Sequence, residues 1–354
     1  MKRAHPSAMV IASHGIETPG KIISVCALSS SSDKDVRFIA GTYEATVNLL
    51  IIYAKDKGNV ETYSEYRRLE VPCDVRHIVA LSDSDVAVAF TDGYIRIYDV
   101  YHDSGIALVQ EIKSCETSCV NRLIYENGQL YAGNEAGELK VHDLTTASKQ
   151  GKTLIKNMTA VTSMCRIDES SMGCGQLLGN IWLAKKEEKE GNVEFKPVCH
   201  KLTRIYGITS ICAHPVHEGL IAFGTDQGHI GLYDVQRSSV SPLLLVSAGP
   251  IWKIAFDPEN PDIFYSCSED GKLIEWDCTQ LENSHEHPEA DRLRFTSAAN
   301  VKNQLTHRTL LSATTPVNCF DIVNGRFIAG LEGCQINVIR VIPEEQVVLK
   351  VRNG

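Results

Sequence analysis

The 354-residue chain contains no run of about eighteen consecutive apolar residues, the length that a helix needs to cross a bilayer. Its N-terminal stretch, MKRAHPSAMVIASHG, has no apolar segment long enough for a secretory signal. The 12 cysteines are scattered, and several stand alone in apolar runs, where a thiol behaves as a small buried hydrophobe. We therefore expect a soluble intracellular protein with reduced thiols and no membrane insertion.

Clusters of basic residues are also missing. The net charge is −9, and the longest Lys/Arg runs are the pairs Arg67–Arg68 and Lys185–Lys186. A nucleic-acid-binding protein usually presents a basic face to the phosphates. The sequence therefore predicts no direct nucleic-acid partner, and its acidic balance favours protein partners instead.

Motifs of catalysis and of cofactor binding are absent as well. The chain has no P-loop, dinucleotide fingerprint or nucleophile elbow. Three pairs of potential metal ligands occur, namely Cys115/Cys119, His214/His217 and His285/His287. The first pair lacks a second half at a fitting spacing, the second reads as a turn between strands, and the third lies in a polar loop. We predict no catalytic residue, cofactor, metal or small-molecule substrate.

What the sequence does contain is a repeat of an apolar run, a polar turn, an alternating apolar run, and then usually an aromatic or His followed by Asp. The clearest copies are VAVAFTDGYIRIYDV (86–100), QLYAGNEAGELKVHDL (129–144), LIAFGTDQGHIGLYDV (220–235) and IFYSCSEDGKLIEWDC (263–278). Fainter copies cover 37–55, 171–186 and 326–341, which makes seven. The turn positions are Asn48, Gly93, Gly137, Gly179, Gly228, Gly271 and Cys334. A period in the low forties is typical of a propeller blade.

Eleven residues mark this repeat, in its turns and at its strand ends. The turn markers are Asp92, Gly93, Gly137, Gly228, Asp270 and Gly271, and the strand-end markers are Asp99, Asp143, Asp234, Trp276 and Asp277. The two Asp-Gly pairs are expected to supply the positive φ that a tight hairpin turn needs. We expect Trp276 to pack between blades and Asp277 to cap its strand. The carboxylates of Glu269 and Asp270 then belong to a turn rather than to an active site.

Short apolar strands flank each hairpin and complete the blades. Inner strands are predicted at 22–28, 74–81, 120–126, 161–167, 208–214, 251–257 and 317–323, and outer strands at 59–63, 107–111, 152–155, 192–196 and 243–246. No segment has helical periodicity. The sequence therefore predicts an all-β protein: a single seven-bladed β-propeller of four-stranded antiparallel blades over residues 1–354.

Two places depart from the regular repeat. A polar insertion at about 279–310 lengthens the last interval; it is either a contact site or a tolerated loop. The run KKEEKEGN (185–192) is predicted to be a charged, solvated hairpin tip.

Closing the ring requires one further strand for the seventh blade. AMVIAS (8–13) and QVVLKV (346–351) compete for this place. We favour the N-terminal segment, because its apolar residues have no other core to join.

Trp276–Asp277, together with Tyr98–Asp99, Tyr233–Asp234 and His142–Asp143, gives nearly the whole chain a resemblance to the WD40 family. DPENPD (257–262) with the hairpin after it, CDVRH (73–77) and VNCFDIV (317–323) with FIAGLEG (327–333) further resemble the WD40 nucleoporins of the Y-shaped outer-ring scaffold complex. This resemblance implies no catalytic residues, and it assigns no contact residue.

The resemblance implies a non-catalytic scaffold subunit of the nuclear pore complex that binds other nucleoporins, among them helical solenoids. It places the protein at the nuclear envelope, supporting pore assembly and the transport of protein and mRNA, with visits to kinetochores in mitosis. Two alternatives stay open, because propellers serve many functions. One is a peptide-binding adaptor, either a histone-binding protein or a ubiquitin-ligase substrate receptor; the other is an enzyme, which no group of residues supports.

Overall fold

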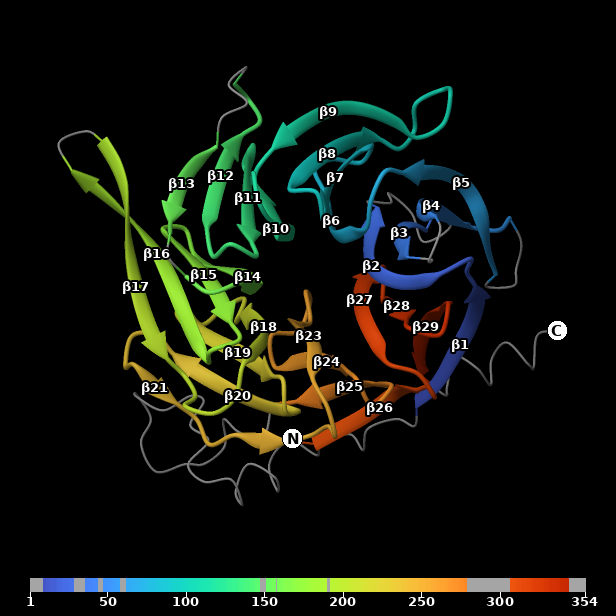
Figure 1. The fold of residues 1–354 in the computed structure, drawn as a ribbon. Helices are drawn as coiled ribbons and strands as arrows, with labels where there is room; N and C mark the ends of the chain where they lie inside the picture. Colours follow the sequence, from blue (N-terminus) through green and yellow to red (C-terminus); the bar gives the residue numbers. More distant parts are fainter. Residues whose placement is uncertain are drawn as a thin grey trace.

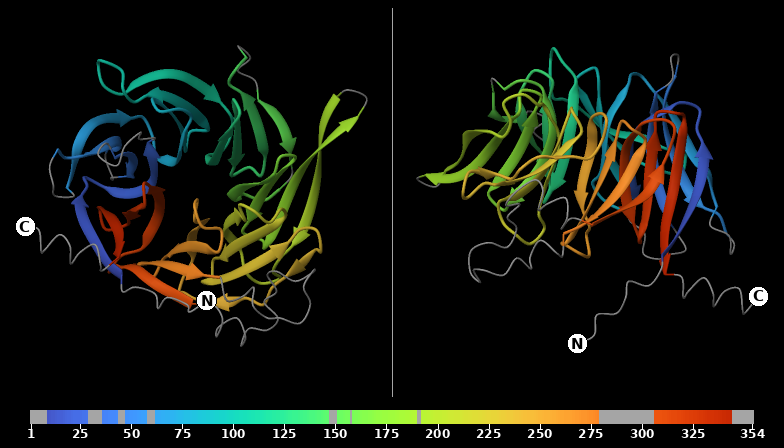
Figure 2. Two further views of the ribbon diagram at one scale, coloured as in Figure 1. Left: turned by 180° about the vertical axis from the view of Figure 1, so that it is seen from behind. Right: turned by 90° about the horizontal axis from the view of Figure 1, so that it is seen from below.

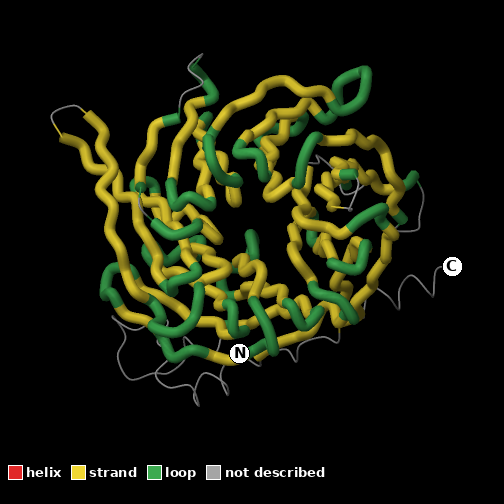
Figure 3. Tube along the Cα trace, in the orientation of Figure 1, coloured by secondary structure: helices red, strands yellow, loops and turns green. Residues whose placement is uncertain are grey.

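The computed structural model describes residues 9–28, 36–43, 47–57, 62–146, 151–156, 158–189, 192–278 and 306–343. These residues form strands, turns and loops, as the strands and loops of Figure 3 show, and no helix occurs among them. No helix long and apolar enough to cross a membrane is therefore found in these ranges.

The strands form seven antiparallel sheets around a central axis, which confirms the predicted seven-bladed propeller (Figures 1 and 2). The first three blades are β2 (Lys21–Leu28), β3 (Arg37–Tyr43), β4 (Asn48–Lys55) and β5 (Tyr63–Val71); β6 (Val75–Ala80), β7 (Asp85–Phe90), β8 (Tyr94–Asp99) and β9 (Ala107–Lys113); and β10 (Val120–Glu126), β11 (Gln129–Asn134), β12 (Leu139–Asp143) and β13 (Lys152–Ile155).

The remaining four blades follow the same order from the axis outward. They are β14 (Val161–Asp168), β15 (Ser171–Gln176), β16 (Asn180–Lys189) and β17 (Asn192–Lys201); β18 (Ile208–Ala213), β19 (Leu220–Thr225) and β20 (His229–Asp234) with β21 (Ser239–Val240) and β22 (Leu244–Leu245); β23 (Ile251–Phe256), β24 (Ile263–Ser268), β25 (Lys272–Asp277) and β26 (Thr306–Ser312); and β27 (Val317–Val323), β28 (Arg326–Leu331), β29 (Gln335–Pro343) and β1 (Met9–Glu17).

The hydrophobic core is a ring of contacts between neighbouring sheets. Seven apolar clusters of described residues occur, and each joins two adjacent blades. The cluster around Phe38, for example, combines residues of the first blade with Ile328 and Val338 of the seventh. Both faces of each sheet are thus covered by the neighbouring sheets, and no single blade encloses a core of its own.

The N-terminal segment closes the ring, as the sequence favoured. Strand β1 pairs antiparallel with β29 from Met9↔Pro343 to Glu17↔Gln335 (Figure 1). Fewer apolar side chains support this strand than its sequence suggests: only Ile11 and Ile16 of its described side chains pack as partly buried hydrophobics against the core. The backbone hydrogen bonds of the pairing therefore carry much of the closure. The competing C-terminal segment, 346–351, lies outside the described residues.

The outer strands of the first, fifth and sixth blades differ from the prediction, which gave the sixth blade no outer strand. The first blade ends in Tyr63–Val71 rather than 59–63, and the sixth ends in β26, whose residues Thr306–Leu310 were expected to belong to the insertion. In the fifth blade only Leu244–Leu245 of the predicted outer strand 243–246 is a strand, and a second two-residue strand, Ser239–Val240, lies before it; both pair with β20. Outer strands face solvent on one edge, so their apolar patterns are weak. The rest of the insertion, 279–305, lies outside the described residues.

Two turn predictions also need correction. Asn48 is the first residue of β4, paired with Tyr43, and not a turn residue. In the two Asp-Gly turns only the glycines adopt positive φ, +81° at Gly93 and +80° at Gly271, whereas Asp92 and Asp270 do not.

The carboxylates of these two aspartates instead accept hydrogen bonds, Asp92 from the Tyr94 N–H and Asp270 from the Ser268 hydroxyl. Turns in which both residues have positive φ occur at Asn127–Gly128 and Asn324–Gly325. The Asn-Gly pairs there were the stronger hairpin signal.

The charged run 185–192 forms the end of a long hairpin, as predicted, because β16 and β17 pair out to Lys189↔Asn192. This hairpin extends beyond the neighbouring blades on the left of Figure 1. The two strands of this hairpin have 10 residues each, more than any other described strand.

Deleting residues 1–17 should lower the free energy of unfolding by about 3 kcal/mol or more, since it removes the pairing along β29 and two apolar side chains. Deleting residues 345–354, beyond the last described strand, should cost far less. Urea unfolding of both variants measures the difference. A larger loss from the C-terminal deletion would show that closure does not depend on β1.

Candidate functional site

A β-bulge recurs at the same place in the inner strand of every blade. The pairing register shifts after the first apolar residue of each strand, between Ile22/Ser24, Val75/His77, Val120/Arg122, Val161/Ser163, Ile208/Ser210, Ile251/Lys253 and Val317/Cys319. A bulge turns consecutive side chains out of the normal alternation. Counted from this first apolar residue, the second and third residues of each inner strand therefore have different surroundings.

Side chains at the second position join neighbouring blades. Those of Asn121, Thr162, Thr209 and Asn318 donate to the main-chain carbonyl of the first apolar residue of the next inner strand, over 2.6 to 3.1 Å. Arg76 donates instead to Asn121 Oδ1, at 3.1 Å. These inter-blade hydrogen bonds lie next to the axis and fix how each blade sits against the following one.

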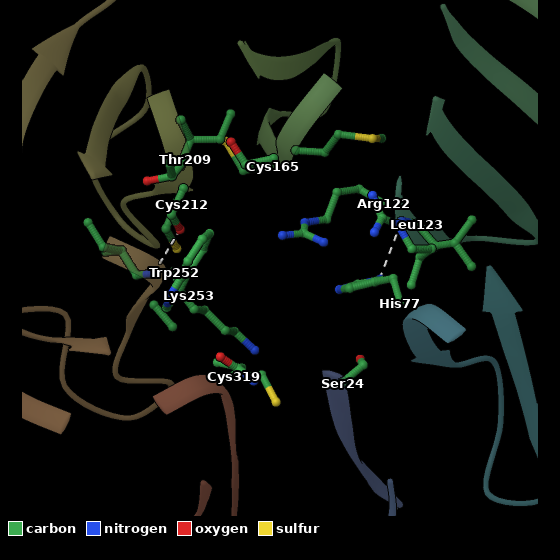
Figure 4. Close-up of a pocket in the computed structure, with 18 of the residues that line it drawn as sticks. Ser24, His77, Arg122, Leu123, Cys165, Thr209, Cys212, Trp252, Lys253 and Cys319 are labelled. Atoms are coloured by element: carbon green, nitrogen blue, oxygen red, sulfur yellow. Dashed lines mark hydrogen bonds between the residues drawn. The ribbon is translucent and has the colours of Figure 1, made fainter. Parts of the chain in front are cut away.

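Side chains at the third position form a ring around the central channel. Its members are Ser24, His77, Arg122, Ser163, Ser210, Lys253 and Cys319, all of which line one cavity of about 280 Å³. Most of them are labelled in Figure 4. We call this set the channel ring.

Several members of the channel ring also act between blades. Ser24 Oγ and Ser210 Oγ accept hydrogen bonds from the main-chain N–H groups of Ile78 and Ile254, over 3.1 and 2.8 Å. His77 Nδ1 accepts from the Leu123 N–H at 3.3 Å. Lys253 Nζ donates to the Phe320 carbonyl at 2.6 Å. The ring is thus both a structural layer and the wall of the channel.

Sequence reasoning missed the channel ring, although a signal existed. Aligning the seven inner strands on their first apolar residue puts a polar, charged or Cys side chain at the third position of every copy. A strand buried on both faces would normally carry apolar residues there. The repeat markers, in contrast, all lie away from the axis.

The repeat markers serve turns and strand ends. Gly93 has no room for a side chain, because a Cβ there would stand 2.2 Å from the Cys115 carbonyl oxygen. Gly137, Gly228 and Gly271 have equivalent close approaches. The carboxylates of Asp99, Asp143 and Asp234 accept hydrogen bonds from the N–H groups of Tyr101, Thr145 and Arg237. These contacts hold loops and offer no chemistry.

Trp276 lies in the cluster between the fifth and sixth blades, and its indole N–H donates to Ser266 Oγ at 2.9 Å. Asp277 is the last residue of β25 and pairs with Ile263 and Thr306. The hairpin of β24 and β25 in the sixth blade therefore serves packing and turn formation.

The candidate metal pairs do not form metal sites in the part of the chain described here. No group of three His, Cys, Asp or Glu side chains that could hold an ion occurs among these residues. His214 and His217 do approach each other, with ring centroids 4.5 Å apart. However, His214 Nδ1 accepts two main-chain N–H bonds, from Val216 and His217, and burial lowers its pKa to about 4. His285 and His287 lie outside the described residues.

Cys115 and Cys119 are engaged locally. The Cys115 thiol lies 3.1 Å from the Ser118 hydroxyl, in the loop between β9 and β10. The described part of this loop offers them no further ligand.

An exposed apolar cluster lies at one end of the fourth blade. Leu177 and Leu178, in the turn before β16, are 53% and 57% exposed, and Ile205, in the loop before β18, is 77% exposed. The two segments touch, because the Leu202 N–H donates to the Gly179 carbonyl at 2.9 Å. Beside them Tyr206 stacks on His229 of the fifth blade, at 4.5 Å. Contiguous exposed apolar side chains commonly mark protein contacts.

Comparison with known proteins gives partial matches, and no family model matches the chain. It is 35% identical over 68 residues to Nucleoporin Nup43 of Mus musculus, covering 19% of this chain and 18% of that protein. It is 28% identical over 81 residues to the Nuclear pore complex protein nup43 of Dictyostelium discoideum, covering 23% and 19%. A third match, 27% over 143 residues, is Dynein intermediate chain 2, ciliary, of Heliocidaris crassispina, covering 37% and 20%.

The chain thus spans about a fifth of the length of the curated relatives it matches. Within these limits the predicted resemblance to a WD40 nucleoporin is confirmed.

Replacing Thr209 with Val should lower the free energy of unfolding by about 1 kcal/mol, because it removes the hydroxyl that donates to Ile251 at nearly constant volume. Thr146→Val is the matched control, since its hydroxyl bond to Asp143 is exposed and local. Denaturant titration of both compares them. Equal losses would show that the inter-blade bonds contribute nothing special.

Native labelling with iodoacetamide should modify Cys199 and Cys334, the two exposed thiols among the twelve, well before the buried ones. Burial raises the pKa of Cys26, Cys174 and Cys319 to about 12, so these thiols are both inaccessible and protonated at neutral pH. Mass spectrometry of peptides locates the label. Rapid modification of Cys174 under native conditions would contradict the closely packed blades.

Proposed function

We propose that this protein is a non-catalytic scaffold subunit of the nuclear pore complex that binds other nucleoporins of the outer ring at the nuclear envelope. The observation that supports this most is the 35% identity to Nucleoporin Nup43 over 68 residues. A second nucleoporin match, in Dictyostelium discoideum, supports the same assignment from a distant organism. The finer roles, in pore assembly and in the transport of protein and mRNA, follow from this proposal.

The geometry is consistent with a platform rather than an enzyme. The aspartate and glycine markers of the repeat lie in turns and at strand ends. Near the axis, the side chains of His77 and Lys253 form hydrogen bonds with the main chain of neighbouring blades. A rigid disc with many short loops at both ends provides a large contact surface at low conformational cost. The helical-solenoid partner implied by the resemblance fits such a surface as a second rigid body.

The apolar cluster of Leu177, Leu178 and Ile205 is our candidate for the nucleoporin contact. Its three side chains are exposed and aliphatic, and they lie on two segments that touch. Exposed apolar patches of this kind commonly mark protein contacts. Helical solenoids offer extended binding surfaces to such a patch. A contact here would leave the opposite end of β18, with the exposed Val216, free of the partner.

The protein, tagged at its own locus in cells of its source, should mark the nuclear rim in interphase and recover outer-ring nucleoporins on affinity purification. Fluorescence imaging and mass spectrometry provide the readouts. Visits to kinetochores stay a prediction, which the same tag tests in mitotic cells. A diffuse signal with ubiquitin-ligase or chromatin partners would contradict the scaffold and favour the adaptor.

The double variant Leu178→Asp, Ile205→Asp should keep its melting temperature, since both side chains are largely exposed, but should recover nucleoporins at least tenfold less well. Val216→Asp, with 64% exposure at the other end of β18, is the matched control and should recover them normally. Equal recovery by all three proteins would move the contact away from this cluster.

A further inference from the structure

The central channel concentrates positive charge in a protein whose net charge is −9. Arg76, Arg122 and Lys253 all line the cavity, and no Asp or Glu is among the described residues that line it. Among the described residues, Asp321 is the carboxylate that pairs with one of these three cations. It stands 3.9 Å from Lys253 Nζ, and it also accepts a hydrogen bond from the Ala27 N–H. The channel therefore carries more positive charge than this one carboxylate balances.

Three donors of the channel ring converge on the same open space. In Figure 4 the guanidinium of Arg122, the imidazole of His77 and the ammonium of Lys253 extend toward the middle of the cavity from three different blades. Arg122 donates to the carbonyl of its neighbour Asn121 at 3.0 Å and forms no ion pair among the described residues. Of the two charged members of the ring, Arg122 is therefore the one without a bond to the next blade.

His77 completes the set as a neutral donor. Its Nδ1 accepts the Leu123 N–H, and burial, with Arg122 and Lys253 nearby, holds its pKa well below the usual value. The single proton of this neutral ring therefore sits on Nε2, the atom that faces the cavity. The pair of cations and this N–H form three donors around one space.

Holding Arg122 in this position is unfavourable without a counter-charge. Burial, and then the charge of Arg76, lowers the pKa of the Arg122 guanidinium to about 10, so it stays protonated at neutral pH while it loses solvation. Arg122 is only partly buried, but it has lost enough solvation that an anionic partner would favour its charged form. The described residues supply none to Arg122, and an anion entering the channel would.

We propose that the central channel binds a small phosphate-bearing anion, with Arg122 as its main ligand and with Lys253 Nζ and His77 Nε2–H as further donors. The cavity of about 280 Å³ holds roughly nine water volumes, at the small end of ligand pockets. It accommodates a di- or triphosphate group and excludes a folded peptide or a nucleic-acid strand. Arg suits this ligand because its fork of donors matches two phosphate oxygens.

Calorimetric titration of the full chain with pyrophosphate, at constant ionic strength, tests the site directly. Pyrophosphate should bind in a 1:1 ratio and raise the melting temperature, and citrate, the carboxylate probe of similar charge, should bind at least tenfold more weakly. No saturable heat up to about 1 mM pyrophosphate, the weak end of specific affinity, would overturn the proposal. Equal binding of citrate would overturn the phosphate assignment.

Two variants separate binding from folding. Arg122→Gln should weaken pyrophosphate binding about tenfold or more, the value of one charge-assisted hydrogen bond, without lowering the melting temperature of the ligand-free protein. Arg166→Gln, a matched loss of one positive charge on β14 outside the cavity lining, pairs with Glu126 and should bind normally. If Arg122→Gln loses stability but keeps its pyrophosphate affinity, Arg122 is structural and the proposal is wrong.

Discussion

The pairing of β1 with β29 is the contact on which the rest of this structure depends. The seven apolar clusters lie between blades, so each blade is stable only when it has a neighbour on both sides. The first and seventh blades gain that second neighbour only when the ring is closed. Closure joins residues more than 300 positions apart, at an entropic cost that the hydrogen bonds of the nine register pairs and the cluster around Phe38 must offset together.

Around the axis a second layer of order comes from the repeated bulge. In five blades it directs one side chain toward the next inner strand, and in all seven it directs another toward the channel. Uncharged members of the channel ring, such as Ser24 and Ser210, accept hydrogen bonds from the main chain of the next blade. Arg122 forms no such bond, and its partly buried charge is left facing the channel. Structure and ligand recognition therefore meet at the same seven positions.

The seven blades, their inner strands and the N-terminal closure were predictable, because Gly turns and apolar runs recur at a regular spacing. The outer strands were not, since strands such as YSEYRRLEV (63–71) and THRTLLS (306–312) face solvent and lack a continuous apolar face. The turn conformation at Asp92 depends on contacts with the loop after β9 that no local pattern reveals. The channel ring joins seven strands distant in sequence, so it is visible only once a bulge shared by all of them is known.

Native-state amide hydrogen exchange, followed by mass spectrometry, tests the closed ring most directly. If β1 completes the propeller, its amides and those of β29 exchange only when the whole protein unfolds, with the same free energy as the amides of β28. The contrary result is clear: if the amides of β1 exchange through local opening while β28 stays protected, the N-terminal strand does not hold the ring closed.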